Sequence, residues 1–60
     1  MKFALFDKDR KQMHEGIAAT VKQPDVITWA NRAFVRSDAV TERGQETVRY
    51  VEVSAYRIGS

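Results

Sequence analysis

The apolar positions of this 60-residue chain change their spacing near its middle. Residues 2–6 are apolar and aromatic and stop at a polar cluster at residues 7–10, which predicts a short β-strand. From Asp25 onward apolar residues recur at every second position within 26–30, 33–37 and 47–58, and this predicts three further strands. Asn31 and Arg32 fit a tight turn between the first two of them, because asparagine tolerates a positive φ.

The segment that follows the first strand has two interpretations. In the first, Asp9 caps a helix that runs from residue 10 to about residue 23. In the second, residues 7–10 form a hairpin turn, residues 11–14 form a second short strand, and the helix begins near residue 15. Both interpretations give the helix one apolar face, which consists of Ile17, Ala18 and Val21.

The order of elements predicts an α+β fold. Pro24 ends the helix, because the residue before a proline avoids the helical region. The polar segment 38–46 is expected to be a loop before the last strand. We therefore expect a single small domain over residues 1–60, with one antiparallel-dominated sheet of three to five strands and a single helix packed on one face.

The alternation of side chains sorts the strand residues onto two faces of this sheet. A turn at residues 31–32 would place Trp29 opposite Phe34, and the last strand would bring Phe34 near Tyr50 and Arg32 near Glu52. One face is aromatic and mixed with arginine: Ile27, Trp29, Phe34, Arg36, Val48, Tyr50, Glu52, Tyr56 and Ile58. The other is small and mainly aliphatic: Val26, Thr28, Ala30, Ala33, Val35, Arg49, Val51, Val53 and Ala55. We assign the aliphatic face to the helix contact, and a one-residue slip in register would exchange the two roles.

Composition narrows the class of protein. The chain is 43% apolar and 30% charged with a formal net charge of +2, which is too apolar for a disordered tail and only weakly basic. It has no cysteine, so neither a disulfide nor a Cys-ligated zinc ion stabilises it. The apolar run at residues 3–6 is shorter than the roughly 7–15 residues of a secretory signal or the about 20 of a membrane span. We therefore expect a cytoplasmic protein with no membrane contact.

The candidate catalytic and metal-binding residues form no complete site. His14 is the single histidine, and the three glycines stand apart instead of forming a phosphate-binding loop. Asp7 and Asp9 begin like a calcium loop, but Lys11 stands where the third oxygen ligand is needed and Gln12 stands where the glycine is needed. We expect no enzyme activity, no catalytic residue, no metal, no cofactor and no small-molecule substrate.

The aromatic and arginine face is the candidate partner-binding surface. Its predicted contact residues are Trp29, Arg32, Phe34, Arg36 and Tyr50. Arg36 stands in mid-strand among aromatic residues where a core would hold an apolar side chain, and exposed aromatic and arginine side chains are typical of protein interfaces. The competing interpretation is that these aromatic residues form the buried face of the sheet.

The first functional interpretation is a small non-enzymatic binding protein that acts on another protein. Accessory regulators and inhibitors, including those carried by phages and mobile elements, are of this size. The alternatives are a nucleic-acid-binding module that uses the aromatic and arginine face, and a structural protein that forms a homodimer. Because one short helix covers only one of two apolar sheet faces, self-association or an obligate partner is expected.

Overall fold

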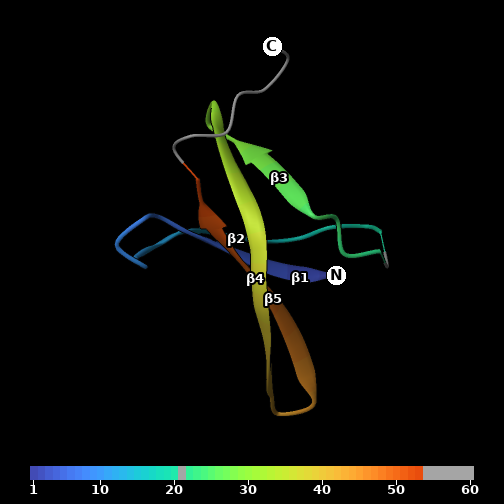
Figure 1. The fold of residues 1–60 in the computed structure, drawn as a ribbon. Coiled ribbons are helices and arrows are strands. Elements are labelled where there is room, and N and C mark those ends of the chain that lie inside the picture. The colour runs from blue at the N-terminus through green and yellow to red at the C-terminus, as the bar shows by residue number, and fades with distance from the viewer. Residues whose placement is uncertain (21, 54–60) are drawn as a thin grey trace.

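The computed structural model describes residues 1–20 and 22–53, and these form one five-stranded sheet (Figure 1). Its strands are β1 (Lys2–Phe6), β2 (Gln12–Ile17), β3 (Val26–Trp29), β4 (Arg32–Glu42) and β5 (Gln45–Glu52). Their order across the sheet is β2-β1-β5-β4-β3. The central neighbours β1 and β5 run parallel, and the other three pairs are antiparallel.

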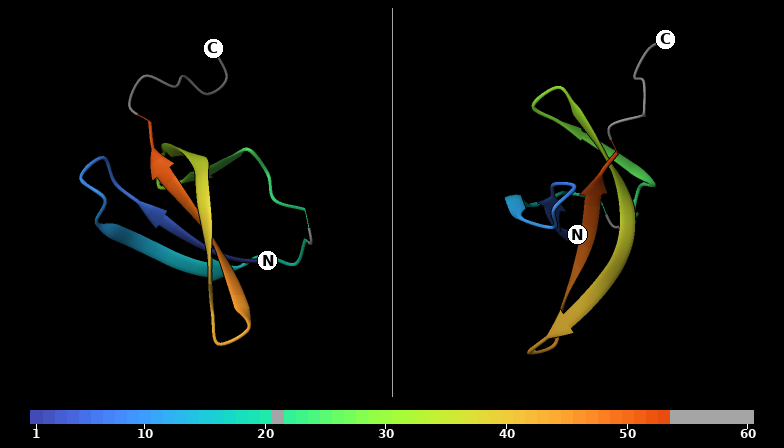
Figure 2. Two further views of the ribbon diagram at one scale, coloured as in Figure 1. Left: turned by 60° about the horizontal axis from the view of Figure 1, so that its bottom comes forward. Right: turned by 60° about the vertical axis from the view of Figure 1, so that its left-hand side comes forward.

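The sheet curls strongly, so that it resembles half of a barrel (Figure 2). The curl brings side chains of its two outermost strands together on the concave side, which we call the inner face. The ring of His14 in β2 stacks on Trp29 in β3, with 4.7 Å between ring centroids and 14° between ring planes. In the described residues no ladder of backbone hydrogen bonds joins β2 to β3. Side chains alone therefore bridge this seam.

The expectation of an α+β fold is wrong, because the described residues contain no helix. Residues 12–17 form a strand that pairs with β1, as the hairpin interpretation foresaw in part for residues 11–14. Ile17 was expected to pack beneath a helix, yet it is 79% exposed at the edge of the sheet. Val21, from the same expected helix face, lies outside the described residues.

The strand character of β2 is hidden in the sequence because its inward positions are not aliphatic. His14 and Gly16 lie opposite Leu5 and Phe3 of β1. A methyl group added at Gly16 would come within 2.9 Å of the Phe3 ring, so the glycine makes room for that ring. The strand is stabilised by pairing with β1 and by ring packing, neither of which gives a period-two apolar pattern.

The core lies on the inner face, at the centre of the curl. Leu5, Phe34, Val48 and Tyr50 are fully buried there. Partly buried apolar side chains surround them: Met1, Phe3, Met13, Ile27 and Trp29. The aromatic face is therefore the core, and the aliphatic face, which we had assigned to the core, lies on the outside. For β3, β4 and β5 the predicted division of residues between two faces agrees with the observed pairing.

Both hairpins of the second half turn through two residues with positive φ, as type I′ turns require. The turn between β3 and β4 uses Ala30 (φ 53°) and Asn31 (φ 60°), not Asn31 and Arg32 as expected. Trp29 consequently pairs with Arg32, and Ile27 pairs with Phe34. This register differs from the predicted one by two residues, so each side chain stays on its expected face.

The expected loop at residues 38–46 is instead the end of a long hairpin. β4 continues to Glu42, the chain turns at Arg43 (φ 51°) and Gly44 (φ 79°), and β5 starts at Gln45. Ser37 is an extra residue in the ladder, because Arg36 pairs with Tyr50 while Asp38 pairs with Arg49. The end of this hairpin projects past β1 and β2 (Figure 1). The last strand was expected to reach Ile58, but Tyr56 and Ile58 lie outside the described residues.

Candidate protein-binding surface

The five residues predicted to bind a partner lie together on the inner face, but they are not equally accessible. Phe34 and Tyr50 have 0% exposure and form part of the core. Trp29 is half-buried against His14, whereas Arg32 and Arg36 are exposed. The structure thus places the two buried rings where no partner reaches them in the folded chain.

Arg36 and Tyr50 hold the segment that precedes β3. The Tyr50 hydroxyl donates a hydrogen bond to the Pro24 carbonyl oxygen at 2.7 Å. Arg36 donates from Nη1 to the Gln23 carbonyl oxygen at 3.2 Å and forms an ion pair with Asp25 at 3.2 Å. Burial raises the pKa of the Tyr50 hydroxyl above its ordinary value, so the hydroxyl keeps its proton. Both side chains thereby have structural roles that account for their positions.

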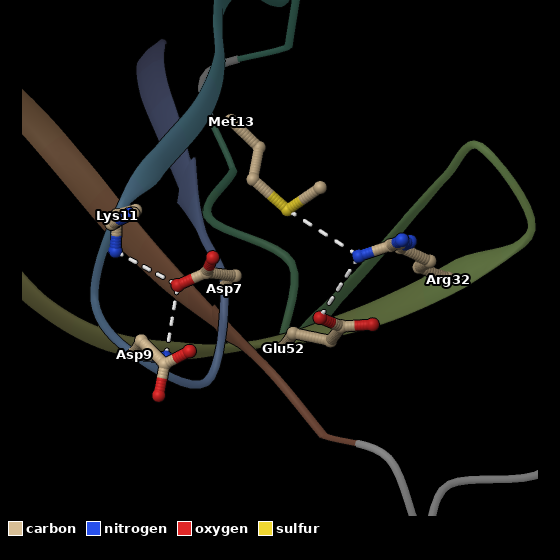
Figure 3. A network of polar contacts seen from close by, with 6 residues as sticks. All are labelled: Asp7, Asp9, Lys11, Met13, Arg32 and Glu52. Carbon is tan, nitrogen blue, oxygen red and sulfur yellow. Dashed lines mark hydrogen bonds and ion pairs between the residues drawn. The ribbon is translucent and has the colours of Figure 1, made fainter.

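Arg32 belongs to the seam between the outermost strands. Its Nη1 lies 3.3 Å from Oε1 of Glu52 and 3.7 Å from the sulfur of Met13 (Figure 3). The predicted proximity of Arg32 and Glu52 is therefore confirmed. In the same view the Asp7 carboxylate accepts hydrogen bonds from the backbone N–H groups of Asp9 and Lys11, which closes the turn between β1 and β2.

The opposite, outer face carries a continuous row of apolar side chains. Phe6 of β1 pairs with Val51 of β5, Val51 pairs with Val35 of β4, and Val35 pairs with Val26 of β3. We call these four residues the outer strip. Each is half-buried, so each presents part of its side chain to solvent. The strip crosses four adjacent strands, and no other described element covers it.

One ion pair and one further arginine, Arg10, border the outer strip beside Phe6 and Val51. Arg49 donates two hydrogen bonds to the Asp38 carboxylate, from Nε to Oδ1 at 2.6 Å and from Nη2 to Oδ2. These bonds lower the pKa of Asp38 and raise that of Arg49, so both groups stay charged. This edge of the strip therefore carries a neutral ion pair and, in addition, the positive charge of Arg10.

A polar groove of about 470 Å³ lies on the same face, between the β1–β2 hairpin and the end of the β4–β5 hairpin. Lys2 and Arg43 supply positive charge to its lining, and Glu15 and Glu42 supply negative charge. Arg49, which is paired with Asp38, also lines the groove, so its lining holds charges of both signs and favours neither anions nor cations strongly.

Within residues 1–20 and 22–53, no three histidine or acidic side chains gather as metal ligands would. Nor does this described part of the chain contain a helix with the length and apolar character needed to cross a bilayer. Comparison with protein families, curated proteins and solved structures finds no match to this chain.

The sequence grouped three of the four members of the outer strip on one face but gave that face the wrong role. The valines at positions 26, 35 and 51 were grouped on one face, and that face was expected to pack against the helix. Phe6 was not connected with them, because a parallel pairing of the first and last strands leaves no signal in local spacing. The pairing of Phe6 with Val51 is what makes the row continuous.

Proposed function

We propose that this chain is a small non-enzymatic binding protein that acts through contact with another protein, in the manner of an accessory regulator or inhibitor. The observation that carries the proposal is the outer strip, a continuous apolar row on the accessible face of the sheet. Apolar surface that lies together on a soluble protein is typical of interaction sites. The charged side chains of Asp38, Arg49 and Arg10 at one edge of the strip also resemble the polar rim that surrounds the apolar core of an interface.

The proposal moves the contact surface from the inner face to the outer face. Binding through the predicted inner-face residues would require Phe34 and Tyr50 to leave the core, where both are fully buried. Stacking of nucleic-acid bases would need the same rings to be accessible. The burial of these rings removes the reason for a nucleic-acid role, and we do not propose one.

Photo-crosslinking at defined positions tests the proposal. A photo-reactive residue at Thr28, exposed beside Val26 on the outer face, should capture one specific protein in cells of the source organism. The same residue at Thr41, near the hairpin end, should not. The captured protein is then purified and titrated with the parent chain and with Val35→Lys.

Val35→Lys should weaken this binding at least tenfold, because a charged group is introduced into an apolar contact. Val40→Lys is the matched control, since Val40 is a half-buried valine on the same strand and face beyond the Asp38–Arg49 pair. Equal binding by the parent and by Val35→Lys would refute the proposal. Binding of the purified protein that weakens steeply with rising salt would indicate that ionic contacts, and not the apolar strip, carry the complex.

A further inference from the structure

We infer that the partner protein inserts an acidic side chain, flanked by apolar residues of its own, into a small pocket between Arg10 and the end of the outer strip formed by Phe6 and Val51. The inference rests on the proposed function, because it names the chemistry of the protein that covers this surface. Its support comes from the size of the pocket, from the unpaired guanidinium of Arg10 and from the apolar side chains beside it.

The pocket lies on the outer face, where the turn between β1 and β2 approaches the β4–β5 hairpin. It has a volume of about 80 Å³ and is lined by residues of both hairpins: Phe6, Arg10, Ser37, Asp38, Arg49 and Val51. That is roughly the space of two or three water molecules in the liquid. Small-molecule ligands occupy pockets of about 300–1,000 Å³. The pocket therefore fits one functional group of a larger partner and is too small for a free ligand.

Arg10 brings to this pocket a positive charge that the other described residues leave unpaired. Its backbone N–H donates a hydrogen bond to the Asp7 carbonyl oxygen at 3.0 Å, which fixes the turn. Its side chain is exposed, and the guanidinium has no ion pair within residues 1–20 and 22–53. A planar guanidinium with free N–H groups binds a carboxylate through two parallel hydrogen bonds. An acidic side chain is thus the group that suits Arg10 best.

The Asp38–Arg49 pair sets the remaining charge of the pocket. Arg49 donates to the Asp38 carboxylate from Nε and Nη2, so the pair is neutral and its Nη1 group lies outside that contact. The hydrogen bond from Arg49, and to a smaller extent the charge of Arg10, lower the pKa of Asp38, which keeps the pair intact. An incoming carboxylate therefore meets two arginines and one acid that is already neutralised.

A β-bulge adds a polar group to the same pocket. Ser37 is the extra residue of β4, and Asp38 follows it in register with Arg49. Bulges redirect side chains and are common beside functional sites. The exposed Ser37 hydroxyl lines the pocket, where it can donate a hydrogen bond to a carboxylate oxygen.

Phe6 and Val51 form the apolar side of the pocket and also one end of the outer strip. A carboxylate that lies against them is partly shielded from water, which strengthens its attraction to Arg10. The neighbouring residues of the partner then lie over the strip and are expected to be apolar. Pocket and strip together therefore select one acidic residue within an apolar segment. A partner with a long run of charge, such as a phosphate backbone, would leave the strip uncovered.

Two blocked tripeptides test the pocket without the partner protein. Acetyl-Val-Glu-Val-amide and its Gln counterpart are titrated separately into the isotope-labelled full chain, and NMR follows the backbone amides of Arg10 and Ser37. The Glu peptide should bind about threefold more tightly, as expected for one exposed ion pair. Equal shifts from both peptides, or none from either, overturn the inference. Equal shifts from inorganic phosphate also overturn it, because they would show a general attraction of anions.

Arg10→Asn should remove the preference for the Glu peptide. Asparagine tolerates the positive φ of 64° at this position, so the turn should persist. Arg43→Asn is the matched control: Arg43 is also exposed and has a φ of 51°, but it lies at the hairpin end and does not line the pocket. This control removes the same charge and should keep the preference. Circular dichroism melting checks that both variants are folded. A preference lost equally in both variants would indicate net charge alone and overturn the inference.

The protein captured from Thr28 provides a second test. Arg10→Glu should weaken its binding about tenfold, and lysine in place of one acidic residue of that protein should restore it. Val35→Lys decides the proposed function independently, because it changes the strip and not the pocket. Binding weakened by Val35→Lys but not by Arg10→Glu would refute the acidic anchor alone. Equal binding by Val35→Lys and the parent would refute the proposed function, while the peptide titrations still decide whether the pocket takes a carboxylate.

Discussion

Replacement of Tyr50 by phenylalanine isolates one hydrogen bond within the core. The ring fills a fully buried position, and phenylalanine keeps its volume and leaves no cavity. The substitution removes only the hydroxyl that donates to the Pro24 carbonyl at 2.7 Å. A net intramolecular hydrogen bond contributes about 0.5–1.5 kcal/mol. Because Pro24 is exposed, water replaces the lost donor, and we expect a loss of about 1 kcal/mol.

A loss of this size is measurable in so small a protein. For a domain of about 60–100 residues, 1 kcal/mol corresponds to a decrease in melting temperature of roughly 4–8 °C. Circular dichroism follows the melting of the sheet, and urea titration gives the free energy of unfolding with an unchanged slope. Replacement by leucine serves as the comparison, since it removes the ring and adds a packing defect of a few kcal/mol.

The same substitution should remove a pH dependence. Burial raises the pKa of Tyr50 in the folded protein above the value of about 10 in the unfolded chain. Between the two values the folded state binds more protons than the unfolded state, so stability decreases as pH rises above about 10. Tyr50→Phe should lack this contribution, and an ultraviolet difference titration against the parent should show the raised pKa. A parent and variant with the same melting temperature and the same alkaline stability profile would refute the placement of this hydroxyl.

Three further results are expected from other parts of the sheet. Leu5→Ala should lower the free energy of unfolding by about 2–5 kcal/mol, because Leu5 is fully buried. The total stability of such a small domain is only about 3–5 kcal/mol, so circular dichroism should show a largely unfolded chain. A cooperative melt near that of the parent would contradict the assigned core. Gly16→Ala should lower the melting temperature, because the added methyl group would come within 2.9 Å of the Phe3 ring. The double variant with Phe3→Leu should recover part of this loss. If the losses of the two single variants simply add, the contact does not exist. The Asp38 carboxyl should titrate below its ordinary pKa when followed by NMR, and Arg49→Gln should return it towards that value; an unchanged titration would show that the ion pair does not form in solution.

The sequence predicted the faces of β3, β4 and β5 because alternation of side chains is a local property that survives an error in register. The predicted turn lay one residue away from the observed turn at Ala30. This error shifts the pairing of β3 with β4 by two residues, so every side chain keeps its predicted face. The choice of the buried face failed for a different reason. It assumed a helical cover, whereas the curl of the sheet lets the aromatic side chains cover one another across the His14–Trp29 seam.

The predictions for β2 and for the end of the β4–β5 hairpin were also wrong, because the spacing of apolar residues does not show what stabilises these two segments. β2 was partly assigned to a helix because Ile17 and Ala18 match helical spacing, while its inward residues, His14 and Gly16, carry no apolar signal. The hairpin end was assigned to a loop because it extends beyond the core and is polar on both faces. Its strands persist because the turn at Gly44 and the backbone ladder stabilise them without a buried side. Because the aromatic face is the buried one, the candidate binding surface is the outer strip and not the aromatic residues.

The parallel contact between β1 and β5 has a consequence for how the chain reaches its fold. The two strands at the centre of the sheet come from opposite ends of the described chain, with Lys2 beside Thr47 and Phe6 beside Val51. The β1–β2 hairpin and the β3–β4–β5 meander each form from neighbours in sequence, but the core closes only when these halves meet. Closing such a long loop is slow compared with local pairing, which predicts folding in milliseconds to seconds. On the ribosome, β1 remains without its parallel neighbour until β5 has been synthesised, so the core forms late and all at once.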